Sequence, residues 1–139
     1  FLDLFAGSGA IGIEALSRGA KEAVFVEKAP AAVSCIRANL AFTKLADRAR
    51  VMDADVFGAL ARLDGTAPFD YIFMDPPYDH ELEKQVLLAL QGRSFVDEDT
   101  VIIVEASKHT DFSYVEEYGY RIARRKEYKT NLHLFLQKQ

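Results

Sequence analysis

The chain has 139 residues, is 50% hydrophobic and carries a formal net charge of −4. A chain of this length buries a substantial core but has little room for a second domain. It contains no apolar run of about 18 residues, which argues against a membrane-spanning helix, and its single cysteine excludes an internal disulfide. We therefore expect one soluble domain over residues 1–139, in the cytoplasm and without a membrane partner.

Strand and helix patterns alternate along the chain. The expected strands cover residues 1–6, 23–27, 49–52, 71–74, 101–105, 120–126 and 132–137, and the expected helices cover residues 10–18, 30–43, 56–63 and 81–90. Five strands that alternate with these helices, followed by a closing β-hairpin, predict an α/β fold with a doubly wound sheet.

Cysteine and histidine give no sign of a metal site. Cys35 falls in a helical pattern with Val33 and Ile36, and we expect it to pack in the core. The three histidines are widely spaced and make no recognisable ligand pattern with one cysteine. We predict no metal.

A glycine-rich turn follows the first strand. Gly7, Gly9 and Gly12 fit G-x-G-x-x-G, in which glycines allow a tight turn and a close backbone approach to a ligand at a helix N-terminus. The pattern is typical of dinucleotide-binding and S-adenosylmethionine-binding folds, and sometimes marks only a packing turn. Glu27 ends the next strand, at about the 20-residue spacing where an acidic residue binds ribose hydroxyls. The alternative for Glu27 is a water-exposed carboxylate.

The tetrapeptide Asp75-Pro76-Pro77-Tyr78 follows the fourth strand. The prolines fix φ, remove two N–H donors and push Asp75 into an extended conformation. Carbonyls in this turn are therefore available to a ligand, beside a carboxylate and an aromatic ring, as a planar amino group on a base requires. A chance turn is the alternative. Because ligands of doubly wound sheets bind beyond the carboxyl ends of the strands, we expect this turn beside the glycine turn.

These segments carry a resemblance to a known family. They are Asp3 to Gly9 (DLFAGSG) followed by residues 14–20 (EALSRGA), residues 25–27 (FVE), and residues 75–78 (DPPY). In this order they resemble the RsmD-like family of 16S ribosomal RNA (guanine-N2)-methyltransferases over nearly the whole chain. Family members carry a further N-terminal segment, so we expect this chain to lack a native one. The turn at residues 127–130 also departs from the Tyr-Gly turn expected there.

The resemblance implies a Rossmann-like class I S-adenosylmethionine-dependent methyltransferase. Its seven-stranded sheet would have the order 3-2-1-4-5-7-6, with strand seven antiparallel. S-adenosyl-L-methionine would be the methyl donor and S-adenosyl-L-homocysteine the product. The implied cofactor-binding residues are Asp3, Phe5, Ala6, Gly7, Ser8, Gly9, Glu27, Lys28, Ala54 and Asp55, with Ala29 lining the adenine. For Asp55, a helix N-cap is an equal alternative, and both roles can coexist.

The implied reaction is methylation of the exocyclic N2 amino group of a guanine in small-subunit ribosomal RNA. Asp75, Pro76, Pro77 and Tyr78 would be the catalytic residues, and the partner would be ribosomal RNA within a small-subunit assembly particle, bound by a monomer. Two basic groups are candidates for phosphate contact. They comprise Arg121, Arg124, Arg125, Lys126 and Lys129, and Arg37, Lys44, Arg48 and Arg50. Their alternative is an ordinary solvated surface.

Three other functions remain open. An adenine N6-methyltransferase acting on DNA or another RNA uses a similar Asp/Asn-Pro-Pro-Tyr turn. A nicotinamide-dependent oxidoreductase would explain the glycines and Glu27 but leaves residues 75–78 without a role. A nucleoside-binding module without activity would not need Asp75.

Overall fold

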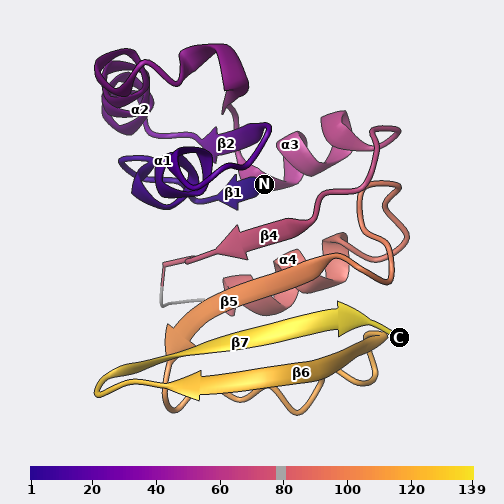
Figure 1. The fold of residues 1–139 in the computed structure, drawn as a ribbon. Helices are drawn as coiled ribbons and strands as arrows, with labels where there is room; N and C mark the ends of the chain where they lie inside the picture. Colours follow the sequence, from indigo (N-terminus) through magenta and orange to yellow (C-terminus); the bar gives the residue numbers. More distant parts are fainter. Residues whose placement is uncertain (78–80) are drawn as a thin grey trace. The chain divides into compact units, whose positions relative to one another are not determined.

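The computed structural model describes residues 1–77 and 81–139. Tyr78, predicted to be catalytic, lies outside the described residues. The strands are β1 (Leu2–Leu4), β2 (Ala23–Glu27), β3 (Ala49–Asp53), β4 (Tyr71–Met74), β5 (Val101–Ser107), β6 (Tyr120–Glu127) and β7 (Asn131–Lys138). The helices are α1 (Ala10–Ser17), α2 (Pro30–Thr43), α3 (Val56–Leu63) and α4 (Leu82–Ala89), with a short 3-10 helix, η1 (Ala46–Arg48) (Figure 1).

The strand order confirms the predicted topology. The sheet runs β3-β2-β1-β4-β5-β7-β6. Strands β1 and β2, β2 and β3, and β4 and β5 pair in parallel, whereas β7 is antiparallel to both β5 and β6. The α/β class, the seven strands and the antiparallel seventh strand are therefore as predicted.

The predicted boundaries agree closely with the observed ones. One strand end and the predicted burial of one residue differ. Strand β1 ends at Leu4, two residues early, because Phe5 takes a left-handed conformation with φ of 60° and turns the chain. The expected core position of Cys35 is wrong, since this residue is exposed. The buried stripe of α2 consists of Val33, Ile36 and Leu40, and Cys35 lies off that stripe.

The chain forms two compact units, of which the first covers Phe1–Arg62. Its core cluster contains Leu16 of α1, Ala23 and Phe25 of β2, and Ile36 and Leu40 of α2. Helices α1 and α2 thus bury their apolar stripes against the central strand of this unit. The packing fixes the loops that follow β1 and β2, which carry the predicted cofactor residues Phe5 to Gly9 and Lys28.

The second unit covers Leu63–Gln139. One face of its strands is fully buried, by Ile72 and Met74 of β4, Ile102, Val104 and Ala106 of β5, and Leu132, Leu134 and Leu136 of β7. Helix α4 contributes buried Val86 and Leu87. The alternate positions of β5 and β7 are half-buried and include Glu105 and His133. This second face therefore accepts polar side chains.

No helix among the described residues is long and apolar enough to cross a membrane. In that same part of the chain, no three His, Cys, Asp or Glu side chains gather as metal ligands would.

Candidate functional site

A buried carboxylate holds the start of α1. The N-cap residue Gly9 has φ of 81° and no side chain to cap the helix. Asp3, only 2% exposed in β1, accepts a hydrogen bond at its Oδ2 from the Gly12 amide, 3.1 Å away. A carboxylate at a helix N-terminus satisfies an otherwise unpaired N–H and interacts well with the helix dipole. Asp3 thus stabilises the end of the glycine turn from the neighbouring strand.

The three positions of the turn differ in why each of them is occupied by glycine. A Cβ at Gly12 would lie 2.3 Å from Cε2 of Phe25, so α1 packs against β2 more closely than any side chain allows. A Cβ at Gly9 would lie 3.3 Å from Ile36, which is also tight. At Gly7, with φ of +60°, a Cβ would meet nothing within 4 Å. The Gly7 backbone is therefore the part of the turn that a ligand can approach.

Glu27 joins the glycine turn to the start of α2. Its Oε1 accepts from the Gly7 amide at 2.8 Å, and its Oε2 accepts from the amides of Lys28 and Ala29, both at 3.0 Å. Glu27 is half-buried, so the alternative of a water-exposed carboxylate does not describe it. The backbone N–H groups of Lys28 and Ala29 are directed to this carboxylate, and both residues are exposed.

The remaining loop contacts complete this part of the site. Asn39 of α2 donates from Nδ2 to the Ser8 carbonyl at 3.0 Å, a contact that sequence reasoning missed. The Ala6 amide donates to the Val26 carbonyl at 3.0 Å. The predicted residues from Phe5 to Gly9 are thus held to both β2 and α2. No local sequence signal identifies Asn39, because its partner lies 31 positions away.

Residues after β3 lie next to Glu27. The Ala54 amide donates to the Glu27 carbonyl at 3.2 Å. Asp55 accepts from the Gly58 amide at 3.0 Å, which confirms the N-cap interpretation of this residue. Its role toward an adenine amino group stays a prediction. The first unit therefore contains every predicted cofactor residue: Asp3 lies in β1, Glu27 ends β2, and the others lie on the loops that follow β1, β2 and β3.

In the second unit, Asp75 is paired with a second carboxyl group. Asp75 follows β4 and shares a hydrogen bond with Glu105 of β5. The residue is exposed as a whole, but its carboxyl is partly removed from water. Burial of the carboxyl, together with the hydrogen bond and negative charge of Glu105, raises the pKa of Asp75 to about 7. Pro76 is buried and Pro77 is exposed.

Glu105 is held by two polar side chains of β7. Its Oε1 lies 2.8 Å from His133 Nε2 and accepts from Asn131 Nδ2 at 3.1 Å. Burial works to raise the pKa of Glu105, but the hydrogen bonds from its partners hold that pKa below its ordinary value. The proton that the two carboxyls share therefore favours Asp75. Sequence reasoning missed Glu105, Asn131 and His133.

Aromatic rings surround His133. Its ring meets Phe73 edge-on, with centroids 6.4 Å apart, and Tyr128 with centroids 5.0 Å apart. The ammonium of Lys126 lies 5.5 Å from the Tyr128 ring centroid. The carboxyl pair thus opens onto a sheet face that carries aromatic and cationic groups, which together suit a nucleotide better than an apolar ligand.

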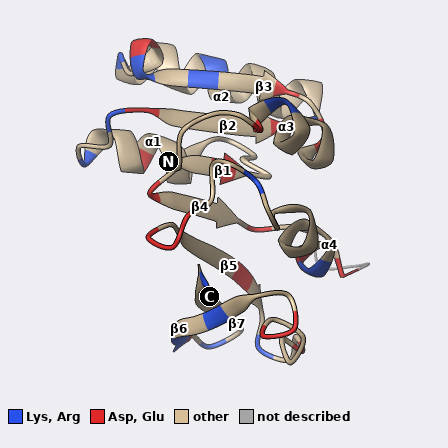
Figure 2. Cartoon of the chain, turned by 90° about the vertical axis from the view of Figure 1, so that its right-hand side faces the viewer, with Lys and Arg blue, Asp and Glu red and all other residues tan. Residues whose placement is uncertain are grey.

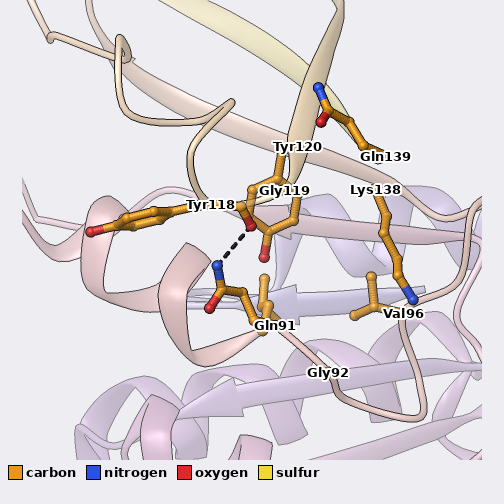
Figure 3. Close-up of a pocket in the computed structure, with 9 residues that line it drawn as sticks. Gln91, Gly92, Val96, Tyr118, Gly119, Tyr120, Lys138 and Gln139 are labelled. Atoms are coloured by element: carbon orange, nitrogen blue, oxygen red, sulfur yellow. Dashed lines mark hydrogen bonds between the residues drawn. The ribbon is translucent and has the colours of Figure 1, made fainter.

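A separate cavity of about 250 Å³ lies at the other end of β6 and β7. Leu90, Tyr118, Tyr120 and Lys138 are among its lining residues, and Gln91 donates to the Tyr118 carbonyl at 2.7 Å (Figure 3). Lys138 pairs with Tyr120, whereas His133 pairs with Lys126 further along the hairpin. This cavity contains none of the predicted site residues.

Two curated relatives come from bacteria. A Bacillus subtilis protein, YlbH, is 36% identical over 127 residues, which are 91% of this chain and 68% of that protein. Ribosomal RNA small subunit methyltransferase D of Escherichia coli K12 is 38% identical over 105 residues, which are 76% of this chain. The chain spans only 52% of the length of that relative.

Solved structures share the fold over almost the entire chain. A conserved hypothetical protein of Streptococcus pyogenes has a TM-score of 0.88 at 32% identity. The match covers 99% of this chain and 84% of the Streptococcus pyogenes chain. The ribosomal protein L11 methylase of Lactobacillus delbrueckii has a TM-score of 0.78 at 17% identity, covering 99% of this chain and 69% of its own, and shows the fold alone. The methyltransferase YhhF of Escherichia coli has a TM-score of 0.83 at 30% identity, covering 99% of this chain and 74% of that protein. With the sheet order described above, the architecture is that of the class I methyltransferases.

The family comparison agrees with these relatives. The sequence model of the family described as Conserved hypothetical protein 95 matches residues 1–137. Because the match covers nearly the whole chain, this chain belongs to that family, the RsmD-like family.

Proposed function

We propose that this chain is the S-adenosylmethionine-dependent methyltransferase part of an enzyme that modifies small-subunit ribosomal RNA, at the exocyclic N2 amino group of a guanine. The observation that carries the proposal is the Asp75-Pro76-Pro77 turn after β4, with its carboxyl supported by Glu105. The name of the Escherichia coli relative supports ribosomal RNA as the substrate. The guanine N2 position comes from the resemblance described above.

The loops of the first unit fit the cofactor by their chemistry. Gly7 leaves open space beside its backbone, and Glu27 ends β2 where ribose hydroxyls would be bound. Glu27, Lys28 and Ala29 would hold the adenosine, with Ala54 and Asp55 beside the adenine. Asp3 and the turn from Phe5 to Gly9 would face the methionine end. When bound, S-adenosylmethionine supplies a methyl group activated by its sulfonium.

The target amino group is a poor nucleophile because its lone pair is delocalised into the base. Two hydrogen bonds, to the Asp75 carboxylate and the Pro76 carbonyl, would favour a pyramidal nitrogen with a localised lone pair and would aim it. Such positioning is worth about 7–11 kcal/mol in favourable cases. Tyr78 would stack on a base swung out of its helix, a contact worth about 1–3 kcal/mol.

We further propose ribosomal RNA within a small-subunit assembly particle as the partner and a cytoplasmic monomer as the working form. Ribosomal RNA is assembled into subunits in the bacterial cytoplasm, and the relatives are bacterial. A set of cations along β6 would contact phosphates. It comprises Arg121, Arg124, Arg125 and Lys126, all exposed. Figure 2 colours the Lys and Arg positions of the chain blue and labels β6.

Two assays test the proposal. Calorimetry with S-adenosylhomocysteine and with NAD separates a methyltransferase from an oxidoreductase, and we expect binding of the first alone. Transfer of a labelled methyl group to small-subunit particles that lack the modification, beside naked ribosomal RNA and DNA, then tests the substrate. Label in the particles supports the proposal. Label in DNA alone contradicts the proposal. Cofactor binding without any methyl transfer would indicate a nucleoside-binding module without activity.

A further inference from the structure

We propose that Glu105 is the positioning residue for Asp75: held in place by β7, it shares one proton with Asp75 and so makes Asp75 the group that takes up the proton released by the target amino group. This inference rests on the proposed function. It adds a carboxyl pair and its supporting histidine to a site that the sequence motif defines by the Asp-Pro-Pro-Tyr turn alone.

The geometry shows that Glu105 is fixed before any ligand arrives. Asp75 and Glu105 directly follow Met74 and Val104, which are register partners in the parallel pairing of β4 with β5. Residues 105 and 133 are direct partners in the antiparallel pairing of β5 and β7, so both side chains project from the same face. His133 Nε2 is 2.8 Å from Glu105 Oε1, and Asn131 Nδ2 is 3.1 Å from the same atom. The His133 ring is in turn held between Phe73 and Tyr128. Glu105 therefore cannot turn away from Asp75 without losing both β7 contacts.

The surrounding charges favour one proton on the pair. Asp75 comes from the end of β4, Glu105 from β5 and His133 from β7, while Lys126 of β6 faces His133 across the hairpin. Two carboxylates in contact do not both ionise readily, because like charges repel in a partly buried site. Since β7 donates its hydrogen bonds to Glu105, the proton belongs mainly to Asp75 until it is lost near pH 7.

The pairing suits methyl transfer once Asp75 has lost the shared proton. An isolated surface aspartate, with a pKa of about 3.9, would be a weak proton acceptor at neutral pH. Because burial and the neighbouring Glu105 raise the pKa of Asp75, its carboxylate is a better proton acceptor near neutral pH. In the step itself the N–C bond forms as the S–C bond breaks, the sulfur keeps the electron pair, and the nitrogen loses one proton to Asp75. The methylated base leaves neutral, and Asp75 returns the proton to water.

The pH dependence of single-turnover methyl transfer by the full chain tests this role. We expect the rate of the wild-type protein to rise with pH up to about 7, because only ionised Asp75 accepts the amino proton. In Glu105→Gln the negative charge is gone and the new amide donates to Asp75, so this acid limb should move down by about one pH unit or more. Glu117→Gln removes an exposed carboxylate elsewhere in the same unit and should leave the limb unchanged.

A second measurement does not depend on activity. Carboxyl ¹³C NMR of the protein without substrate should show one aspartate that titrates near pH 7, is absent in Asp75→Asn and moves down in Glu105→Gln. A purely structural role for Glu105 would lower the rate without moving either titration, and that result overturns the proposal. If the NMR shift is found but no RNA is methylated, the proposed function fails and the catalytic role fails with it, while the shared proton stands. Thermal unfolding of each variant confirms that it is folded.

Discussion

The Gly7 amide donates to Oε1 of Glu27 across 2.8 Å, and this bond ties the loop after β1 to the end of β2. The other oxygen of the same carboxylate holds the first amides before α2. Glu27 therefore organises the cofactor loops in addition to any contact with ribose. If Glu27 also binds ribose, ligand affinity should depend strongly on the negative charge of its carboxylate.

We predict that Glu27→Gln weakens binding of S-adenosylhomocysteine by roughly 10- to 100-fold. A hydrogen bond to a charged group contributes about 1.5–3 kcal/mol, and about 1.4 kcal/mol corresponds to tenfold in affinity. Isothermal titration calorimetry measures the change. Glu22→Gln, an exposed carboxylate just before β2, is the control and should bind as the wild type does. Equal affinity for both variants would show that Glu27 has no part in the site.

Two helical glycines form a matched pair for stability. Gly12 and Gly58 each donate an amide to an aspartate near a helix start, Asp3 and Asp55 respectively. A Cβ at Gly12 meets the Phe25 ring, whereas the nearest atoms to a Cβ at Gly58 belong to the Asp55 side chain, with Oδ2 at 3.3 Å. We expect Gly12→Ala to destabilise the protein by about 1–3 kcal/mol through overpacking.

Gly58→Ala should instead increase the free energy of unfolding. Alanine in a helix is favoured over glycine by roughly 0.5–1 kcal/mol, and the end of the Asp55 side chain can move aside. Urea unfolding followed by circular dichroism gives both free energies of unfolding. A Gly12→Ala protein as stable as Gly58→Ala would mean that α1 and β2 do not pack as closely as described.

The cations of β6 give a prediction about RNA. Arg124 lies over the Phe135 ring and Lys126 over the Tyr128 ring, on the face that carries His133. If both contact phosphates, Arg124→Gln with Lys126→Gln should weaken RNA binding and reduce the slope of log affinity against log salt by about 1.4–1.8. Filter binding at several salt concentrations measures this slope.

The control removes two cations outside either basic group. Lys21→Gln with Arg62→Gln makes the same change in net charge and should leave the slope close to that of the wild type. Equal slopes for the two double variants would favour the other role of β6 cations, protection of an exposed edge strand against pairing with other chains.

Much of the fold was predictable because the periodic patterns are long and clean. The bounds predicted for α2, α3, β2 and β4 are the observed ones. The predicted core position of Cys35 is wrong because closeness in sequence to Val33 and Ile36 does not place a residue on their face of the helix. In a helix of about 3.6 residues per turn, neighbours in sequence point to different sides.

The carboxyl pair could not be predicted from local patterns. Glu105 and His133 each occupy an ordinary half-buried strand position, and only the pairing of β5 with β7 makes them partners. The same holds for Asp3: an ionisable residue in an apolar strand signals a need for a partner, but the identity of Gly12 follows from packing. Contacts between residues of different strands or helices depend on how those elements pack, so no pattern within one segment reveals them.

Identifying the nucleoside that receives the methyl group tests the proposed reaction and the role of Asp75 together. The full chain and Asp75→Ala are each incubated with labelled S-adenosylmethionine and small-subunit particles that lack the modification, and the digested RNA is resolved by mass spectrometry. We predict N2-methylguanosine with the wild type and a loss of at least about 100-fold in Asp75→Ala, since the proton acceptor and one positioning contact are removed together. N6-methyladenosine as the product would rule out the proposed reaction, and equal N2-methylguanosine from both proteins would rule out the catalytic role of Asp75.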